Sequence, residues 1–166
     1  MIFADTEEFL RYYDAARQRT RRVIACIPEE HIEWRYADGK FSFGDLVRHL
    51  AAIERFMWAE NVQGRPSRYP GHGRELADGH ARVVALFDRW GAESRAIFAS
   101  LSPGQLQQRC TTPAGATLAV WKWLRAMLEH EAHHRGQVHL MLGMIGAGAP
   151  PLFGLTSEDV RARSQP

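Results

Sequence analysis

Four of the eight histidines in this 166-residue chain fall within ten residues, and two of those four have a spacing that suits metal binding. His130 and His134 are four residues apart, so on a helix they share one face. That face continues along apolar residues and is therefore predicted to turn toward the core; its members include Met127, Val138, Met141 and Ile145. Imidazole nitrogens bind first-row metals at about 2.0–2.1 Å. We interpret His130 and His134 as two ligands of one divalent ion.

A third ligand has to come from another helix, and His49 is the best candidate. It lies in a second apolar stripe, where an imidazole without a partner would cost stability. Facing helices of a bundle build metal sites by projecting such side chains inward. Three neutral histidines with one open position are typical of a catalytic site, and zinc or nickel suits imidazole ligands. The alternative is that the three rings are hydrogen-bonded core residues without a metal.

Residues 130–134 also read H-E-x-x-H, the motif in which zinc peptidases place two ligands and a general base. Glu131 would be that base. The conceivable third peptidase ligand, Glu158, lies beyond a Gly- and Pro-rich segment, and no edge strand is predicted to hold a peptide. We therefore disfavour a peptidase but keep Glu131 as a candidate catalytic base beside the metal. The other histidines are predicted to lie on other faces or at the surface: His31, His72, His80, His133 and His139.

Four amphipathic helices must position these residues. Helical periodicity and N-cap signals predict them near residues 5–27, 42–62, 75–101 and 117–144, with Pro28 ending the first and Ser102-Pro103 ending the third. Residues 63–73 are predicted to form a loop, residues 109–112 an extended segment, and residues 152–166 a loosely packed tail. The pattern predicts an all-α four-helix bundle with short extra segments and a C-terminal tail, as one domain over residues 1–166.

The composition excludes several function classes. A formal net charge of +2 gives no sign of a nucleic-acid partner, and the arginines of residues 17–22 are predicted to form a solvated helix face. No apolar run approaches the roughly 18 residues of a membrane helix, and the N-terminus does not resemble a signal peptide. Cys26 and Cys110 are too few for a disulfide framework. We expect a cytoplasmic protein with no membrane partner.

Three segments carry motifs beyond the histidines themselves. They read FGDLVRHL at residues 43–50, HEAHHRGQ at residues 130–137 and FGLTSEDV at residues 153–160. Together they resemble the DinB/YfiT-like superfamily of small bundle proteins. The resemblance implies an up-down-down-up four-helix bundle, often a homodimer, with a three-histidine site for nickel, zinc or a similar ion. Carried over by position, the ligands are His49, His130 and His134.

The residues around the second motif have their own interpretation. Gly136 lies in mid-helix, where glycine is unfavourable, so it predicts the close approach of a neighbouring segment. Arg135 is predicted to pair with a carboxylate at the surface. Gln137 is a candidate for holding a ligand histidine from behind.

Beyond the site, the resemblance implies a class of reaction. Relatives include thiol-dependent enzymes, so we expect a metal-dependent transferase that activates a low-molecular-weight thiol for attack on a small electrophilic substrate. One alternative is a hydrolase that uses hydroxide on the metal, with Glu131 as base. The other is a non-catalytic metal-binding stress protein whose metal supports folding.

Overall fold

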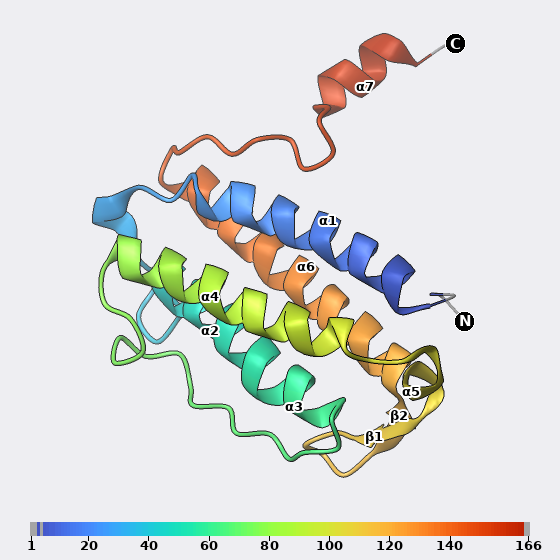
Figure 1. Cartoon of the computed structure of the whole chain (residues 1–166). Coiled ribbons are helices and arrows are strands. Elements are labelled where there is room, and N and C mark those ends of the chain that lie inside the picture. The colour runs from blue at the N-terminus through green and yellow to red at the C-terminus, as the bar shows by residue number, and fades with distance from the viewer. Residues whose placement is uncertain (1–2, 4, 165–166) are drawn as a thin grey trace.

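Four long helices form the body of the molecule in a computed structural model that describes residue 3 and residues 5–164. They are α1 (Thr6–Ile24), α2 (Phe43–Ile53), α4 (His80–Ala99) and α6 (Val120–Met144). In Figure 1, α1 and α6 run in one direction, and α2 and α4 run in the other. The predicted bundle is confirmed, in the up-down-down-up order that the resemblance implied. The long segment from 62 to 79 makes this order possible, because it returns along α2 before α4 begins.

The first two long helices begin at the predicted caps. The Asp5 carboxylate accepts a hydrogen bond from the backbone N–H of Glu8, and Ser42 and Asp45 cap α2 reciprocally. Helix α1 ends at Ile24, before Pro28, because the N–H groups of Cys26 and Ile27 bond three residues back and tighten the chain. A short 3₁₀ turn, η1 (Glu29–His31), then leads toward α2.

The second predicted helix is not regular along its length. After α2 the chain forms a π-helix, η2 (Glu54–Trp58), before it resumes as α3 (Ala59–Asn61). Glu54 and Trp58, one at each end of η2, are both buried. Such wide turns are frequent at functional sites, and this one follows the turn that carries His49.

The region between α4 and α6 departs from the prediction. Helix α4 begins at His80, after Gly79 with its positive φ of 85°, rather than at residues 75–78. Ser102-Pro103 does not simply end that helix, because Ser102 caps a new one, α5 (Pro103–Gln107). The predicted extended segment is strand β1 (Arg109–Thr111), which pairs antiparallel with β2 (Thr117–Ala119). Residues 117–119 therefore belong to a hairpin, and α6 starts at Val120.

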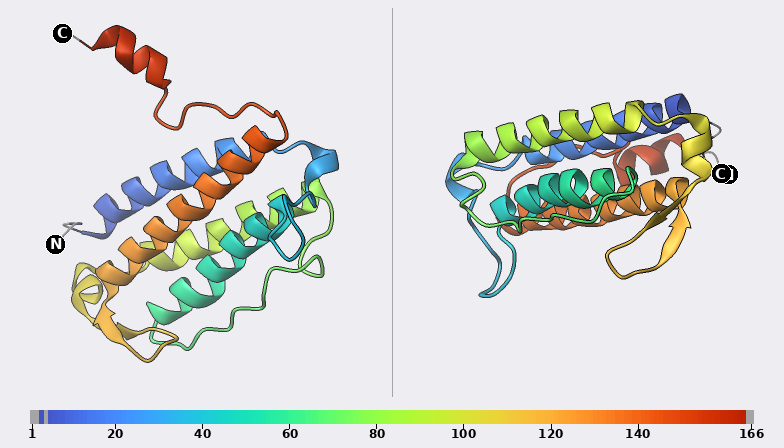
Figure 2. Two further views of the ribbon diagram at one scale, coloured as in Figure 1. Left: turned by 180° about the vertical axis from the view of Figure 1, so that it is seen from behind. Right: turned by 60° about the horizontal axis from the view of Figure 1, so that its bottom comes forward.

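The C-terminal tail contains a last helix, α7 (Ser157–Arg163), which starts at a capping box formed by Thr156 and Asp159. None of its residues is buried. The left view of Figure 2 shows α7 apart from the four-helix body. The tail agrees in this respect with the loose packing expected from its sequence.

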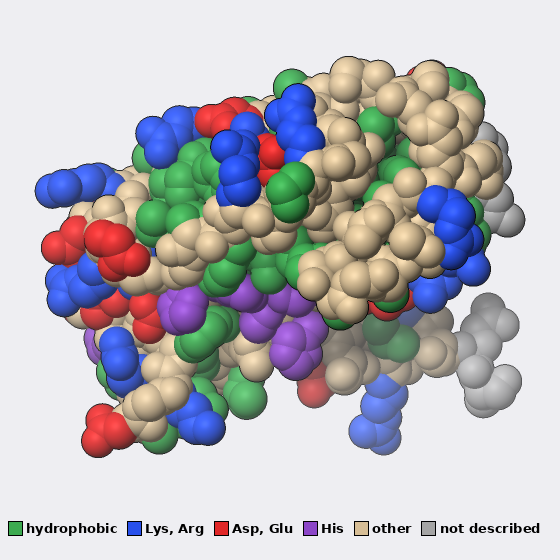
Figure 3. All heavy atoms as spheres, turned by 90° about the horizontal axis from the view of Figure 1, so that it is seen from below, with side chains coloured by type: hydrophobic (Ala, Val, Ile, Leu, Met, Phe, Trp, Pro, Cys, Tyr) green, Lys and Arg blue, Asp and Glu red, His purple; other side chains and the backbone are tan. Residues whose placement is uncertain are grey.

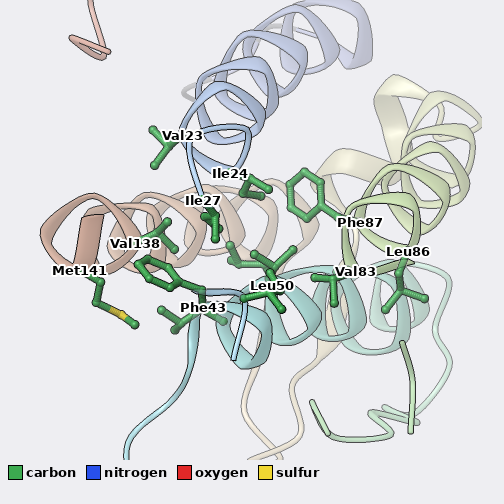
Figure 4. Packing of buried hydrophobic residues seen from close by; sticks show 14 of the residues in the cluster. Val23, Ile24, Ile27, Phe43, Leu50, Val83, Leu86, Phe87, Val138 and Met141 are labelled. Carbon is green, nitrogen blue, oxygen red and sulfur yellow. The ribbon is translucent and has the colours of Figure 1, made fainter. Parts of the chain in front are cut away.

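Apolar side chains from all four long helices fill the centre of the bundle. The cluster drawn in Figure 4 joins Val23 of α1, Leu50 of α2, Val83 of α4 and Met141 of α6, all at most 2% exposed. Burial of apolar surface stabilises a fold by roughly 25 cal/mol per Å². The burial of this cluster therefore holds α2 against α6. Among the described residues, no helix combines the length and apolarity needed to cross a membrane.

Candidate metal centre

Three histidine rings from two helices meet between α2 and α6. His49 comes from α2, and His130 and His134 come from successive turns of α6. The Nε2 atom of His130 lies 3.2 Å from Nε2 of His49 and 3.1 Å from Nε2 of His134. Figure 3 shows histidine side chains gathered at the surface of one face, beside hydrophobic ones. The structure thus brings together the three residues that the spacing singled out.

Two of the three separations between these nitrogens, those from His130 to His49 and to His134, fit a divalent ion. Bonds of about 2.0–2.1 Å place nitrogen ligands about 3.3–3.4 Å apart in a tetrahedron and about 2.9 Å apart in an octahedron. Both observed Nε2–Nε2 distances lie between these values. The Nδ1–H of His134 donates to Oε1 of Gln137 over 2.6 Å, which leaves a lone pair on the Nε2 that faces the other rings. A cation at the shared point would satisfy that lone pair.

Burial keeps these rings neutral. Removal from water, together with the smaller effect of the neighbouring histidines, lowers the pKa of His49 to about 3 and that of His130 to about 4. Burial also lowers the pKa of His134. Neutral imidazole is the form that binds metals.

Two residues from the 62–79 loop complete the surroundings of His49. Tyr69 Oη lies 2.7 Å from Nδ1 of His49 and 3.2 Å from Nδ1 of His72. The Phe41 ring packs on His72, with centroids 4.2 Å apart. Tyr69 was missed by sequence reasoning, and His72 is half-buried rather than a surface residue. Both lie in a segment that carries no helical or strand periodicity, so no local pattern indicates that they join the site.

Arg48 anchors the 62–79 loop beside His49. Its side chain is fully buried, and its Nε donates to the backbone carbonyl of His72 over 2.8 Å. The same guanidinium forms ion pairs with Glu33 at 2.7 Å and Asp45 at 2.8 Å. The charge of Arg48 is therefore compensated while the loop is held against α2.

Aromatic rings close the opposite side of the site. The buried Trp58 ring lies 4.8 Å from the His130 ring and 5.4 Å from Trp123, measured between centroids. The π-helix η2 carries Trp58 into this position. Trp58 thus packs directly against His130, and Trp123 packs against Trp58.

Glu131, the expected base, faces away from this group. One of its carboxylate oxygens accepts a short hydrogen bond from Thr20, and the other lies 3.4 Å from the Arg17 guanidinium. Arg17 also lies 3.4 Å from Glu54, so two buried carboxylates share one arginine. Arg17 is consequently part of the interior rather than of a solvated basic face. Among the described residues, the group with metal-ligand spacing contains three histidines and no carboxylate.

Two further expectations around the α6 motif are corrected. Arg135 is buried and lies 3.4 Å from the backbone carbonyl of Ala16, so it does not form a surface ion pair. Gly136 is exposed, and a Cβ there would meet no atom of the described residues within 4 Å, so the described part of the chain holds no close neighbouring segment at Gly136. Gln137 is placed as expected, against His134. His133 and His139 are exposed and stand outside the group.

Comparison with known proteins places this architecture among described relatives. The family model of the DinB superfamily matches residues 12–138. A DinB-like protein from Bacillus cereus ATCC 10987 superposes with a TM-score of 0.73 at 15% identity, over 90% of this chain and 98% of its own. A DinB-like protein from Bacillus subtilis gives 0.71 at 18% identity, over 87% and 96%.

A third solved structure has a named activity. A mutant of mycothiol-dependent maleylpyruvate isomerase superposes with a TM-score of 0.65 at 16% identity, over 87% of this chain and 62% of that protein. At such identities the likeness shows the shared fold alone. No curated protein sequence gave a significant match.

Proposed function

This chain belongs to the DinB superfamily, and on that premise we propose that His49, His130 and His134 hold one divalent ion, zinc or nickel, at which a low-molecular-weight thiol is activated as the nucleophile of a transferase. The observation that carries the proposal is the convergence of three neutral imidazoles within 4.8 Å at a surface opening. When bound, the ion lowers the pKa of a thiol toward neutrality and so makes it a competent nucleophile.

The surrounding side chains have separate tasks in this scheme. Gln137 and Tyr69 orient the rings of His134 and His49 through their Nδ1 atoms. The Trp58 ring excludes water from the His130 side. The sulfur then forms a bond to the electrophilic carbon, the leaving group departs with the electron pair, and the thiol proton passes to solvent.

Two observations favour a thiol over hydrolysis. The carboxylate of Glu131, which a hydrolytic mechanism would use as base, is engaged by Thr20 and Arg17 on the other side of α6. In addition, a solved protein that shares this fold is mycothiol-dependent by name.

The reaction is tested by incubating zinc- or nickel-loaded protein with a fluorogenic haloalkane and a panel of low-molecular-weight thiols. We expect a rate that saturates with one thiol and disappears in His134→Ala. Turnover without thiol would indicate hydrolysis instead. Metal binding with no rate above the buffer reaction would indicate the non-catalytic alternative.

We also propose that two copies associate through the face between α1 and α6. A groove of about 930 Å³ runs there, and Tyr12 and Phe153 at its edges are 54% and 77% exposed. The seven-residue helix α7 lacks buried residues, and a helix this short is not stable in water without a packing partner. A second copy would supply that partner.

Sedimentation equilibrium tests the dimer. We expect a mass twice the 18.9 kDa of the chain, and a monomer after Tyr12→Glu. Tyr36→Glu is the matched control, because Tyr36 is 51% exposed on a different face. A monomeric wild type would refute the dimer, and dissociation by the control alone would place the interface elsewhere.

A further inference from the structure

A groove of about 590 Å³ opens directly beside His134, in the size range of small-molecule sites. One wall is the loop before α2, with Tyr36, Lys40 and Phe41, and the other is the exposed face of α6. On α6 the wall continues from His134 through Leu140 to Met144, at helical spacing. We call this the α6 groove.

The walls of the α6 groove are apolar although they face solvent. Leu140 is 64% exposed, Met144 is 56% exposed and Tyr36 is 51% exposed. Large apolar side chains gathered in one concave site usually mark a surface that binds something. Low-molecular-weight thiols are polar, so this lining suits the other substrate of a thiol transferase.

One charge is built into this apolar groove. Lys40 is the only charged side chain in its lining, and Lys40 forms no ion pair among the residues that the structure describes. The preceding Gly39 has a φ of 71°, in the left-handed region, which gives the tight turn that presents Lys40 at the groove edge. An ammonium without a partner beside apolar walls matches a ligand that has one anionic group and an apolar body.

We propose that the α6 groove binds the electrophilic substrate, a small molecule with an apolar body and a carboxylate. Its carboxylate pairs with the Lys40 ammonium, its body covers Leu140 and Met144, and its reacting end lies toward His134. The inference rests on the proposed function, since it names the substrate class for the same site.

The test is calorimetric titration of metal-loaded protein with 4-phenylbutyrate and, separately, with the uncharged 4-phenylbutanamide. We expect Lys40→Gln to weaken binding of the carboxylate about tenfold and to leave the amide unchanged. Lys122→Gln is the matched control, because Lys122 is the only other lysine and is exposed on α6 away from the groove. Leu140→Asp should weaken binding of both probes.

Three outcomes overturn the proposal: equal binding of the carboxylate and the amide, unchanged carboxylate binding in Lys40→Gln, or displacement of the carboxylate by saturating glutathione. Repeating the titration on metal-stripped protein separates this proposal from the function on which it rests. Carboxylate binding that depends on the metal but not on Lys40 would refute the groove assignment alone. Lys40-dependent binding in a protein that cannot be loaded with metal would refute the proposed function and leave the groove.

Discussion

The hydrogen-bond partners of the Nδ1 atoms of His49 and His134 determine how these two rings are oriented. Nδ1 of His134 is held by Gln137 at 2.6 Å, and Nδ1 of His49 by Tyr69 at 2.7 Å. Such partners fix the tautomer and the orientation of a ligand ring, and their loss typically costs 10–100-fold in metal affinity. His130 is oriented differently, by packing against Trp58.

We therefore expect Gln137→Leu and Tyr69→Phe each to weaken zinc binding by about 10–100-fold without loss of the fold. Competition with a chromophoric chelator measures the affinity, and circular dichroism checks the fold. His133→Ala is the control, since His133 lies against His134 but outside the ligand group. Unchanged affinity in both variants would show that the two hydrogen bonds do not organise the rings.

The sequence predicts the histidines of this site better than their surroundings. The i, i+4 spacing and the apolar stripes single out His49, His130 and His134, because helical periodicity reports which face is buried. Tyr69 and His72 lie in a loop whose path depends on the Arg48 anchor, a long-range contact that no local pattern records. The motif made Glu131 a candidate base, but it carried no indication that Thr20 and Arg17 of α1 would contact its carboxylate.

At the scale of the helices, two glycines in mid-helix have opposite surroundings. A Cβ on Gly91 of α4 would lie 2.8 Å from the Arg17 guanidinium, which cannot easily move because it lies 3.6 Å over the Phe87 ring and between two carboxylates. Gly136 of α6 meets nothing. Glycine is thus needed in α4 for close packing against α1, and is dispensable in α6.

We expect Gly91→Ala to lower the free energy of unfolding by about 1–3 kcal/mol through overpacking. Gly136→Ala should raise it by about 0.5–1 kcal/mol, because alanine is the better helix former. Urea unfolding of both variants measures the difference. Stabilisation by both substitutions would contradict the close fit of α1 on α4.

The π-helix buries Glu54, and burial raises the pKa of its carboxyl to about 7, although the charge of Arg17 and the hydrogen bond from Tyr13 act to lower it. The nearby charge of Glu131 also raises the pKa of Glu54. Because the pKa is higher in the folded state than in the unfolded chain, the folded state binds the proton more tightly. The stability from this group is complete below the unfolded pKa of 4.5 and is lost as the pH rises toward 7.

Glu54→Gln should remove this dependence. The wild type should lose about 1–3 kcal/mol relative to the variant between pH 5 and about 7.5, as measured by urea unfolding of both proteins. Subtracting the free energy of unfolding of the variant from that of the wild type at each pH removes the contribution of the histidines. Parallel pH profiles would show that Glu54 is ionised throughout and that its pKa is not raised.

The predicted elements agree with the structure where local signals are strong. They differ where the pairing of two strands determines the secondary structure. The caps at Asp5 and Ser42 are correct because they depend on side chains within four residues. Only one strand of the hairpin at residues 109–119 was predicted. The sequence of β1 has an extended pattern, whereas that of its partner β2 was interpreted as the start of a helix. The π-helix had no signal at all, because one extra residue in a turn leaves the apolar spacing nearly unchanged.

At the scale of the whole molecule, the parallel course of α2 and α4 is what leaves the metal centre open. The long 62–79 segment returns along α2 instead of closing a tight turn (Figure 1). Its Tyr69 and His72 contact the His49 ring. The α6 groove opens beside His134, so the third ring borders an open site. We propose that residues 1–166 act as one domain around this site, with α7 reserved for a second copy.

The central claim is that the three histidines hold one metal ion, and metal content tests it most directly. Elemental mass spectrometry of gently purified protein should find about one zinc or nickel per chain. His49→Ala and His134→Ala should each lose that metal, while His139→Ala should retain it. A wild type that carries no metal and cannot be loaded with zinc or nickel would contradict the account.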